Sequence, residues 1–378
     1  MTYFANPVHH YTGKRRHRVD IVGLFTLIFL LLAAFPVYGQ ETPPVITADN
    51  IARLQPVERI TFADLPAEAG RVESGWFAAS ADGQQIALLN RDNGIVLWDF
   101  AQGGYVATAT TACGDQPGAF VDGGFNRDGS YFVAAYLAGA TGYVAFHPLD
   151  ESQAAGRVVC DLPALPLRVW PGDTGQAWLE FFPNDPQLAP SVGLLLPGAE
   201  WDAALIPSGP ENDADSFFRV GRIEPPLAVT ATREGVVKRW NLETGDVTAE
   251  AQLGALPGIG QVNRGGDQAG RYFAWVDGSG TALHLLDFET GANRSLTVLN
   301  GKSVPFLWLT SGADIVIGVN VDSELGVTAW DTATGQVYDL GVYRSCSRPP
   351  DRVHLSYDGT TLVIGCDTGL DIWRVGEQ

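Results

Sequence analysis

Short apolar runs recur along the chain, and each ends on a large apolar residue that a turn follows. Residues 95–99 (Ile-Val-Leu-Trp-Asp) and 236–241 (Val-Val-Lys-Arg-Trp-Asn) are two examples. Successive runs of this kind are 43 to 49 residues apart, so the sequence contains a loose internal repeat. A period of this length, built from short strands, predicts a β-propeller with one blade per unit. The residues that close the runs are Trp98, Phe146, Leu195, Trp240, Leu286, Trp330 and Trp373.

Turn signals separate these apolar runs. Asp-Gly and Asn-Gly pairs accept positive φ and therefore indicate hairpins between neighbouring strands. Such pairs occur at Asp82-Gly83, Asn93-Gly94, Asp128-Gly129 and Asp358-Gly359. A second turn follows the closing residue of several units at the same offset, and we read it at residues 99–103, 241–245, 287–291 and 331–335.

The predicted fold class is all-β: a seven-bladed β-propeller of four-stranded antiparallel blades, with the ring closed by an N-terminal strand. The chain ends five residues after Trp373, which leaves no room for a fourth strand in the last unit. The alternating segment 56–61 is predicted to supply that strand. The third unit is the least regular, because no Asp-Gly turn marks residues 178–182 or 192–196, and Trp201 is a rival to Leu195. If that region is an insertion, the number of blades falls to six.

The N-terminus has the pattern of an export signal. Lys14, Arg15, Arg16 and Arg18 precede an apolar run over residues 21–37, and Val37 and Gly39 offer small side chains for cleavage before Gln40. The alternative is an uncleaved membrane anchor, since the run approaches the length of a short span. The predicted organisation is therefore a signal peptide or anchor at 1–39, a linker at 40–50 and the propeller at 51–378, outside the cytoplasm.

The rest of the chain is acidic. Without residues 1–39 it has 20 Lys+Arg against 42 Asp+Glu, which is a formal charge of −22. Such a surface repels nucleic acid and anionic lipid, so the predicted partner is another protein, with membrane contact only through an uncleaved N-terminal segment. The sequence does not indicate an oligomeric state.

The turns and closing residues resemble those of the WD-repeat family. Ser-x-Asp-Gly precedes a strand at 80–83 and 356–359, and Trp98-Asp99 and Trp330-Asp331 match the dipeptide that names the family. The resemblance runs from Gly75 to the C-terminus, but the family's Gly-His pair does not occur. The chain therefore resembles a divergent, exported member. The resemblance implies a rigid platform for partners more often than catalysis.

The four cysteines of an exported chain predict disulfide bonds. Three pairings are possible. Cys346 lies before the last blade and Cys366 ends a strand within it, so these two are expected to pair. Cys113 and Cys160 lie at similar offsets in neighbouring units and form the second expected pair.

Candidate chemistry is sparse. His147, His284 and His354 lie in three different units, and we expect packing or surface roles for them rather than a metal site at the axis. The acidic residues 211–216 could hold Ca²⁺ but lack the glycine and distal glutamate of an EF-hand loop, so a solvated loop is expected. No nucleophile elbow, phosphate loop or zinc helix occurs. Five tryptophans could stack on sugars if they are exposed: Trp76, Trp170, Trp201, Trp275 and Trp308.

The predicted function is an exported binding or scaffolding module without catalytic, cofactor or metal residues. The stretch from Pro197 to Pro226 is the best candidate for a partner-binding loop. The alternative is an enzyme with its site in the central funnel, such as a hydrolase or a quinoprotein-like oxidoreductase. A third possibility is a structural envelope protein held by the uncleaved anchor.

Overall fold

The structure is a computed structural model of the 378-residue chain, in which Pro43–Gln378 form one compact unit. The predicted signal or anchor, residues 1–39, lies outside the described residues. Within the described part no helix has the length and apolar character needed to span a bilayer. The described ranges are 43–109, 112–114, 116–149, 156–172, 175–181, 191–195, 201–206, 217–220, 227–231, 235–241, 244–253, 264–267, 270–277, 280–298, 304–321, 326–343, 346, 350 and 352–376.

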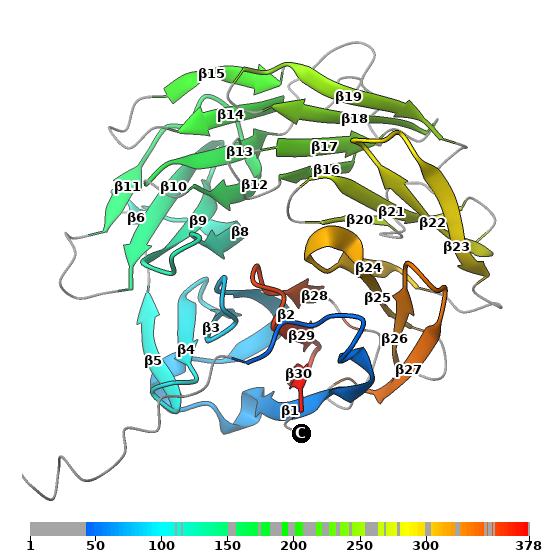
Figure 1. The fold of residues 1–378 in the computed structure, drawn as a ribbon. Coiled ribbons are helices and arrows are strands. Elements are labelled where there is room, and N and C mark those ends of the chain that lie inside the picture. The colour runs from blue at the N-terminus through cyan, green and yellow to red at the C-terminus, as the bar shows by residue number, and fades with distance from the viewer. Residues whose placement is uncertain are drawn as a thin grey trace, which may run out of the picture. The chain divides into compact units, whose positions relative to one another are not determined.

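Six of the four-stranded sheets are each built from four consecutive antiparallel strands (Figure 1). The first two are β2 (Val72–Ala79), β3 (Gln85–Asn90), β4 (Ile95–Asp99), β5 (Gly104–Ala109), and β8 (Ala119–Phe125), β9 (Tyr131–Ala138), β10 (Thr141–Pro148), β11 (Arg157–Val159). The next two are β12 (Pro166–Pro171), β13 (Ala177–Phe181), β14 (Ser191–Leu195), β15 (Trp201–Ile206), and β16 (Phe217–Val220), β17 (Leu227–Ala231), β18 (Val236–Asn241), β19 (Val247–Gln252). The last two are β20 (Arg264–Gly266), β21 (Tyr272–Val276), β22 (Ala282–Asp287), β23 (Asn293–Val298), and β24 (Phe306–Leu309), β25 (Ile315–Val319), β26 (Gly326–Asp331), β27 (Val337–Val342).

One further four-stranded sheet combines the two ends of the propeller unit. Its strand order is β1-β30-β29-β28, with β1 (Leu54–Thr61) antiparallel to β30 (Gly369–Val375), followed by β29 (Thr361–Gly365) and β28 (Arg352–Leu355). The remaining described elements are the short hairpin β6 (Ala112–Cys113) and β7 (Gln116–Pro117), and the 3₁₀ turns η1 (Ile51–Arg53), η2 (Phe62–Asp64), η3 (Ala67–Ala69) and η4 (Ser311–Ala313).

The predicted number of blades and the predicted ring closure need correction. Six blades, not seven, come from consecutive strands, and the remaining sheet is a composite of β28, β29 and β30 with β1. Closure of the ring is also not shown. Hydrophobic clusters join neighbouring sheets at six junctions among the described residues. Among the described residues no hydrophobic cluster joins β12–β15 to β16–β19, and the side chains of β14, β15 and β16 are not described.

A strand that lies between two junctions is packed on both of its faces. In β29, Val363 packs in the cluster shared with β2–β4, whereas Leu362 and Ile364 pack in the cluster shared with β25 and β26. A strand covered on both sides has no solvent-facing positions and so reads as a continuous apolar run. This is the reason why several strands of the sequence do not alternate between apolar and polar residues.

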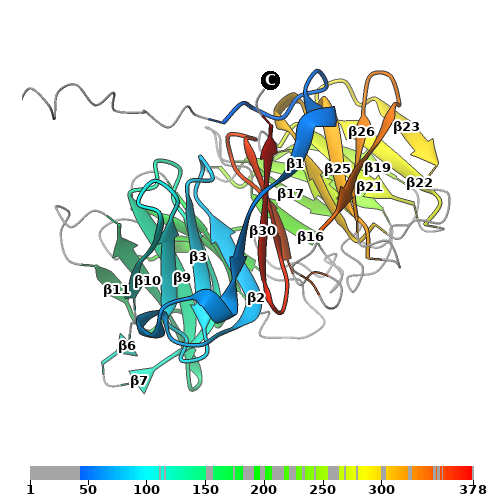
Figure 2. The ribbon, with the colours of Figure 1, turned by 90° about the horizontal axis from the view of Figure 1, so that it is seen from below.

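The first strands of the sheets lie innermost, and the fourth strands lie at the periphery (Figure 1). The inner strands β2, β8, β12, β16, β20, β24 and β28 begin at one end of the propeller, which we call the loop end, since the connections between blades enter there. They finish at the opposite end, the turn end, where the first hairpin of each sheet lies (Figure 2).

A repeated polar turn connects the first and second strands at the turn end. In each copy a side-chain oxygen accepts a hydrogen bond from the backbone N–H five residues later, as Ser80 Oγ does from Gln85 at 2.9 Å. Because this bond satisfies a backbone N–H that is partly or fully buried, the turn needs a short polar residue at its first position. The five described copies begin at Ser80, Asn126, Asp267, Thr310 and Ser356.

Residues just before β1 pack onto the composite sheet at the turn end. Ile46 is 1% exposed, and its N–H donates to the carbonyl of Gly359 at 2.9 Å. Ile51 is also buried in the cluster that contains Trp373. Part of the segment expected as a linker, residues 43–50, is thus held against the propeller.

Candidate functional site

Several inner strands present partly exposed side chains, and in β24 and β28 these alternate with buried ones. In β28, Arg352 and His354 are partly exposed, whereas Val353 and Leu355 are buried. The strand β24 shows the same alternation. Partly exposed or exposed residues with described side chains on the inner strands are Trp76, Ala119, Phe120, Val121, Asp122, Leu167, Arg168, Trp170, Phe306, Trp308, Arg352 and His354. We call Trp76, Phe120, Asp122, Arg168, Trp170, Arg352 and the adjacent Glu180 the inner-strand cluster.

Asp122 connects three sheets within this cluster. From β8, its Oδ1 lies 3.5 Å from Nη1 of Arg352 on β28. Its Oδ2 accepts a hydrogen bond of 3.2 Å from the backbone N–H of Val169 on β12. One carboxylate therefore bridges its own blade to a neighbouring blade and to the composite sheet.

Glu180 lies behind the exposed Arg168. The two residues face each other across β12 and β13, with Arg168 Nε 3.7 Å from Glu180 Oε2. The Glu180 side chain is 4% exposed, and its Oε2 accepts no hydrogen bond within the described structure. Burial raises the pKa of Glu180 to about 7, Arg168 lowers it, and the charge of Asp122 raises it. This carboxyl group therefore titrates near neutral pH.

Aromatic rings surround the charged groups. The guanidinium of Arg352 lies 5.1 Å from the centroid of Trp76, within the range of a cation–π contact. Trp76 also meets Phe120 edge to face at 4.4 Å. The arrangement offers charge, hydrogen-bond donors and flat apolar surface within one small region.

The two disulfide bonds lie near the N-terminal ends of three inner strands. Cys113–Cys160 and Cys346–Cys366 both form, with Cα–Cα distances of 5.9 and 5.0 Å, which confirms the expected pairing. Cys113, Cys160 and Cys346 stand shortly before β8, β12 and β28 respectively.

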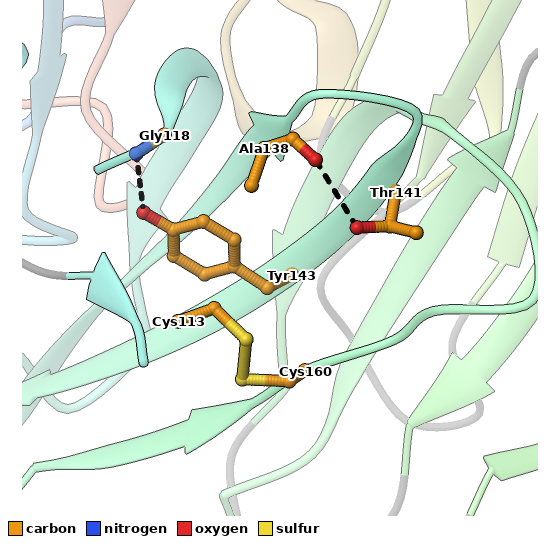
Figure 3. The surroundings of a disulfide bond; sticks show 6 residues. All are labelled: Cys113, Gly118, Ala138, Thr141, Tyr143 and Cys160. Atoms are coloured by element: carbon orange, nitrogen blue, oxygen red, sulfur yellow. Dashed lines mark hydrogen bonds between the residues drawn. A yellow bond between two sulfur atoms is a disulfide. The ribbon is translucent and has the colours of Figure 1, made fainter. Parts of the chain in front are cut away.

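A hydrogen bond close to the Cys113–Cys160 disulfide also holds the N-terminal end of β8. Figure 3 shows Cys113–Cys160 beside the ring of Tyr143. The Tyr143 hydroxyl accepts the N–H of Gly118 at 3.0 Å, immediately before β8 begins. The N-terminal end of β8, the strand that carries Asp122, is thus held by a disulfide bond and by a hydrogen bond to the Tyr143 hydroxyl.

The three predicted histidines lie in three different sheets and make unrelated contacts. His147 on β10 is half-buried, and desolvation of its ring lowers its pKa to about 4; its Nε2 accepts no hydrogen bond within the described structure. His284 stacks on Trp275 at 5.0 Å, and His354 meets Trp308 edge to face at 5.5 Å. In the described ranges no group of three His, Cys, Asp or Glu could hold a metal ion.

The predicted tryptophans have different environments. Trp76, Trp170 and Trp308 are partly exposed on inner strands, whereas Trp275 is 4% exposed. Trp201 begins β15, and its side chain is not among those described.

The stretch Pro197 to Pro226 is not a single loop, which corrects that expectation. It contains β15 and β16, since the strand-forming runs at Trp201–Ile206 and Phe217–Val220 complete two different sheets. The acidic residues 211–216 lie outside the described part of the chain.

The sequence-based interpretation missed the charged members of the cluster. Asp122, Arg168, Glu180 and Arg352 are separated along the chain, and only the packing of inner strands places them together. One local signal was available. A single charged residue within an otherwise apolar strand, such as Glu180 in Ala177–Phe181, indicates a buried partner.

Comparison with known proteins identifies the fold and no more. No family model matches the chain, and no curated protein matches it. Among solved structures, the beta-propeller domain of Cps50 (Swd1) from Myceliophteria thermophila superposes with a TM-score of 0.58 at 14% sequence identity. The match covers 80% of this chain and 97% of that domain. The protein is therefore an all-β protein with a β-propeller fold, similar in architecture to the propeller of Cps50.

Proposed function

We propose that the protein is an exported, WD-like β-propeller that binds another protein at the loop end of its inner strands. The observation that carries this proposal is the placement of the disulfide bonds. Three of the four cysteines, Cys113, Cys160 and Cys346, lie six residues before the first residues of the strands that bear Asp122, Arg168 and Arg352. Cross-links at these points hold the cluster in one geometry, which lowers the entropy cost of binding.

The cellular location is part of the same proposal. Two disulfide bonds fit an oxidising environment, and the basic and apolar N-terminal pattern supports export. The mass of the mature chain tests whether cleavage occurs before Gln40. A mass that includes residues 1–39 would instead support an anchored envelope protein.

Site-specific photo-crosslinking tests the binding function. A photoreactive amino acid replaces Ala119, which is exposed at the loop end of β8, in the full chain expressed in its own source. The matched control replaces Val337, which is 49% exposed on the peripheral strand β27. We expect one reproducible protein adduct from position 119 and none from position 337. Adducts from neither position, or only from position 337, would contradict the proposal.

The alternative is an enzyme, and one observation favours it. Glu180 is a buried carboxyl group with a pKa near neutrality, a property that general acids and bases share. Hydrolase and oxidoreductase assays of the wild type beside Glu180→Gln test this alternative. A turnover that the Gln variant loses would favour catalysis, and a wild type without turnover would leave binding as the function.

A further inference from the structure

The strand β13 carries two buried polar atoms that have no hydrogen-bond partner within the described structure. They are the indole Nε1 of Trp178 and the carboxylate Oε2 of Glu180. Trp178 is 8% exposed and Glu180 is 3% exposed, so both residues are more than nine-tenths buried. The indole N–H can only donate, whereas an ionised carboxylate oxygen accepts. Because a buried polar group without a partner costs stability, two such groups on one strand point to a ligand that satisfies both.

Trp178 and Glu180 lie on the same face of β13. Side chains alternate between the two faces of a strand, and Ala177, Leu179 and Phe181 pack in the cluster shared with β8–β11. The two polar groups therefore lie on the opposite face, on the side of β16–β19 (Figure 1). Two residues along a strand span about 7 Å, so one small molecule with a donor and an acceptor can reach both groups.

The face of β17 that lies toward β12–β15 carries small and hydroxyl-bearing side chains. Val229 and Ala231 pack in the cluster shared with β20–β23, so Ala228 and Thr230 lie on the face toward β12–β15. The Thr230 hydroxyl accepts the indole N–H of Trp240 at 2.9 Å. Second strands at other junctions carry leucine or isoleucine at such positions. Among the described side chains, this junction is therefore more polar than those that apolar clusters fill.

Flat apolar surface lies beside the two polar groups. In the register of β12 and β13, Trp170 is directly opposite Trp178, and Arg168 is directly opposite Glu180. Opposite residues of a sheet project from the same face, so the two indoles and the carboxylate share one face. Trp170 is partly exposed on the inner strand, and Trp178 is buried on the second strand. Aromatic walls with a few polar groups that fix orientation are the usual composition of a small-molecule site.

We propose that this face binds a neutral carbohydrate, with Trp178 Nε1–H donating to one sugar hydroxyl and Glu180 Oε2 accepting from another. A hydroxyl group both donates and accepts, so neighbouring sugar hydroxyls can satisfy the two protein groups together. The apolar C–H face of a sugar ring packs against an indole such as Trp170. A neutral ligand fits because Arg168 already faces Glu180, and the acidic chain repels an anionic sugar. This inference goes beyond the proposed protein-binding function and does not depend on it.

NMR of the indole groups tests this inference. The full chain is labelled with ¹⁵N-tryptophan, which gives one Nε1–H signal for each of its ten tryptophans, and Trp178→Phe identifies the signal of Trp178. The probes are the methyl glycosides of glucose, galactose, mannose, xylose and N-acetylglucosamine, with glucuronate as the anionic counterpart and acetamide as a model of a protein amide. We expect at least one neutral glycoside to shift the Trp178 signal downfield and glucuronate to shift it less.

The other results of this titration would overturn the inference. No shift of the Trp178 signal with any of the glycosides would remove the carbohydrate site. A shift with acetamide alone would show that the two groups recognise an amide of a protein partner instead. A shift with glucuronate equal to that with the neutral glycosides would contradict the neutrality of the ligand.

Trp373 provides a matched control in the same spectra. Its Nε1 also has no partner within the described structure, and Asp371, two residues earlier on β30, is a buried acid on the same face of the strand. Here, however, Asp371 is paired with Arg59 at 3.8 Å, and the ring of Trp373 is packed in an apolar cluster. The Trp373 signal should therefore stay in place when the Trp178 signal moves.

Affinity measurements by titration calorimetry locate the contact. Trp178→Phe keeps a flat ring without the donor, and Glu180→Met keeps a side chain of similar size without the acceptor. Each should weaken binding of the selected glycoside about tenfold, the usual loss for one such hydrogen bond. Both should fold, since neither removes a hydrogen bond that the described structure contains. Trp373→Phe makes the same change in the composite sheet and should leave the affinity unchanged. Unchanged affinity in both Trp178→Phe and Glu180→Met would contradict the roles given to these residues.

Discussion

Asp122 and Arg352 form an ion pair between β8 and β28, with Oδ1 and Nη1 separated by 3.5 Å. The two strands belong to different sheets, and their residues are 230 positions apart in the sequence. The pair is partly shielded from water, with exposed side-chain fractions of 16% and 33%. Its expected contribution to folding stability therefore lies between that of a surface ion pair and that of a buried one.

A double-mutant cycle measures this pair. Asp122→Asn, Arg352→Gln and their combination should give a coupling free energy of about 1 kcal/mol, measured by urea unfolding. High salt should reduce the coupling, since the pair is partly exposed. Asp122→Ala should cost more than Asp122→Asn, because the N–H of Val169 then loses its acceptor. Zero coupling at low salt would show that the two charges do not interact.

Glu180 should make folding stability fall as pH rises. Its pKa is raised from 4.5 to about 7 in the folded state, so between these pH values the folded protein binds more protons than the unfolded chain. The stability contribution is therefore present below about pH 4.5 and lost through pH 7. Glu180→Gln removes this dependence and should stabilise the protein at pH 8 by on the order of 2 kcal/mol. Unfolding curves of both proteins from pH 4 to 8 check the slope, and parallel profiles would contradict the assignment.

His147 should make folding stability rise with pH, which is the opposite of the effect of Glu180. Burial lowers its pKa from 6.5 to about 4, so the unfolded chain binds more protons between these values. Stability is then complete above pH 6.5 and is lost as pH falls to about 4. The variant His147→Gln should be less sensitive to acid than the wild type, by on the order of 2 kcal/mol at pH 4. NMR titration of the ring protons provides a direct measurement, and a midpoint near 6.5 would refute the lowered pKa.

The two disulfide bonds should contribute unequally to stability. They span 47 and 20 residues, and the chain-entropy model gives about 4 and about 3 kcal/mol for loops of these lengths. Paired Cys→Ser variants, Cys113/Cys160 and Cys346/Cys366, allow each to be measured by thermal unfolding. The first pair should lower the Tm more. Both variants should also weaken partner binding, because no disulfide bond then holds the N-terminal ends of the inner strands. Unaffected binding would show that the cross-links do not support the binding site.

Gly83 should be intolerant of a side chain, whereas Gly103 should tolerate one better. Both have positive φ, at 64° and 77°, so alanine costs about 1 kcal/mol of backbone strain at either position. A Cβ at Gly83 would also meet the buried Thr361 of the composite sheet at 2.5 Å, whereas a Cβ at Gly103 would have nothing within 4 Å. Gly83→Ala should therefore lose about 1–3 kcal/mol more than Gly103→Ala. Equal losses by urea unfolding would indicate that the junction yields to the added carbon.

Local sequence determined the β-propeller architecture and much of its detail. Apolar runs closed by Trp98, Trp330 or Trp373 became the third strand of a sheet, because an apolar side chain on both faces requires a neighbour on both sides. Short polar residues such as Ser80 and Ser356 marked hairpins, because their oxygens satisfy a backbone N–H within five residues. The pairing of the cysteines also followed from their places in the repeat.

Only the tertiary structure decided how many blades come from consecutive strands and which residues meet at the centre. The stretch Pro197 to Pro226, expected as one loop, became two strands of separate sheets. Asp122, Arg168 and Glu180 each stand alone among apolar neighbours in the sequence, and Arg352 lies far from all three. Their interaction arises because inner strands from different units converge, and a charge in a nonpolar strand is stabilised only by partners that the fold brings to it.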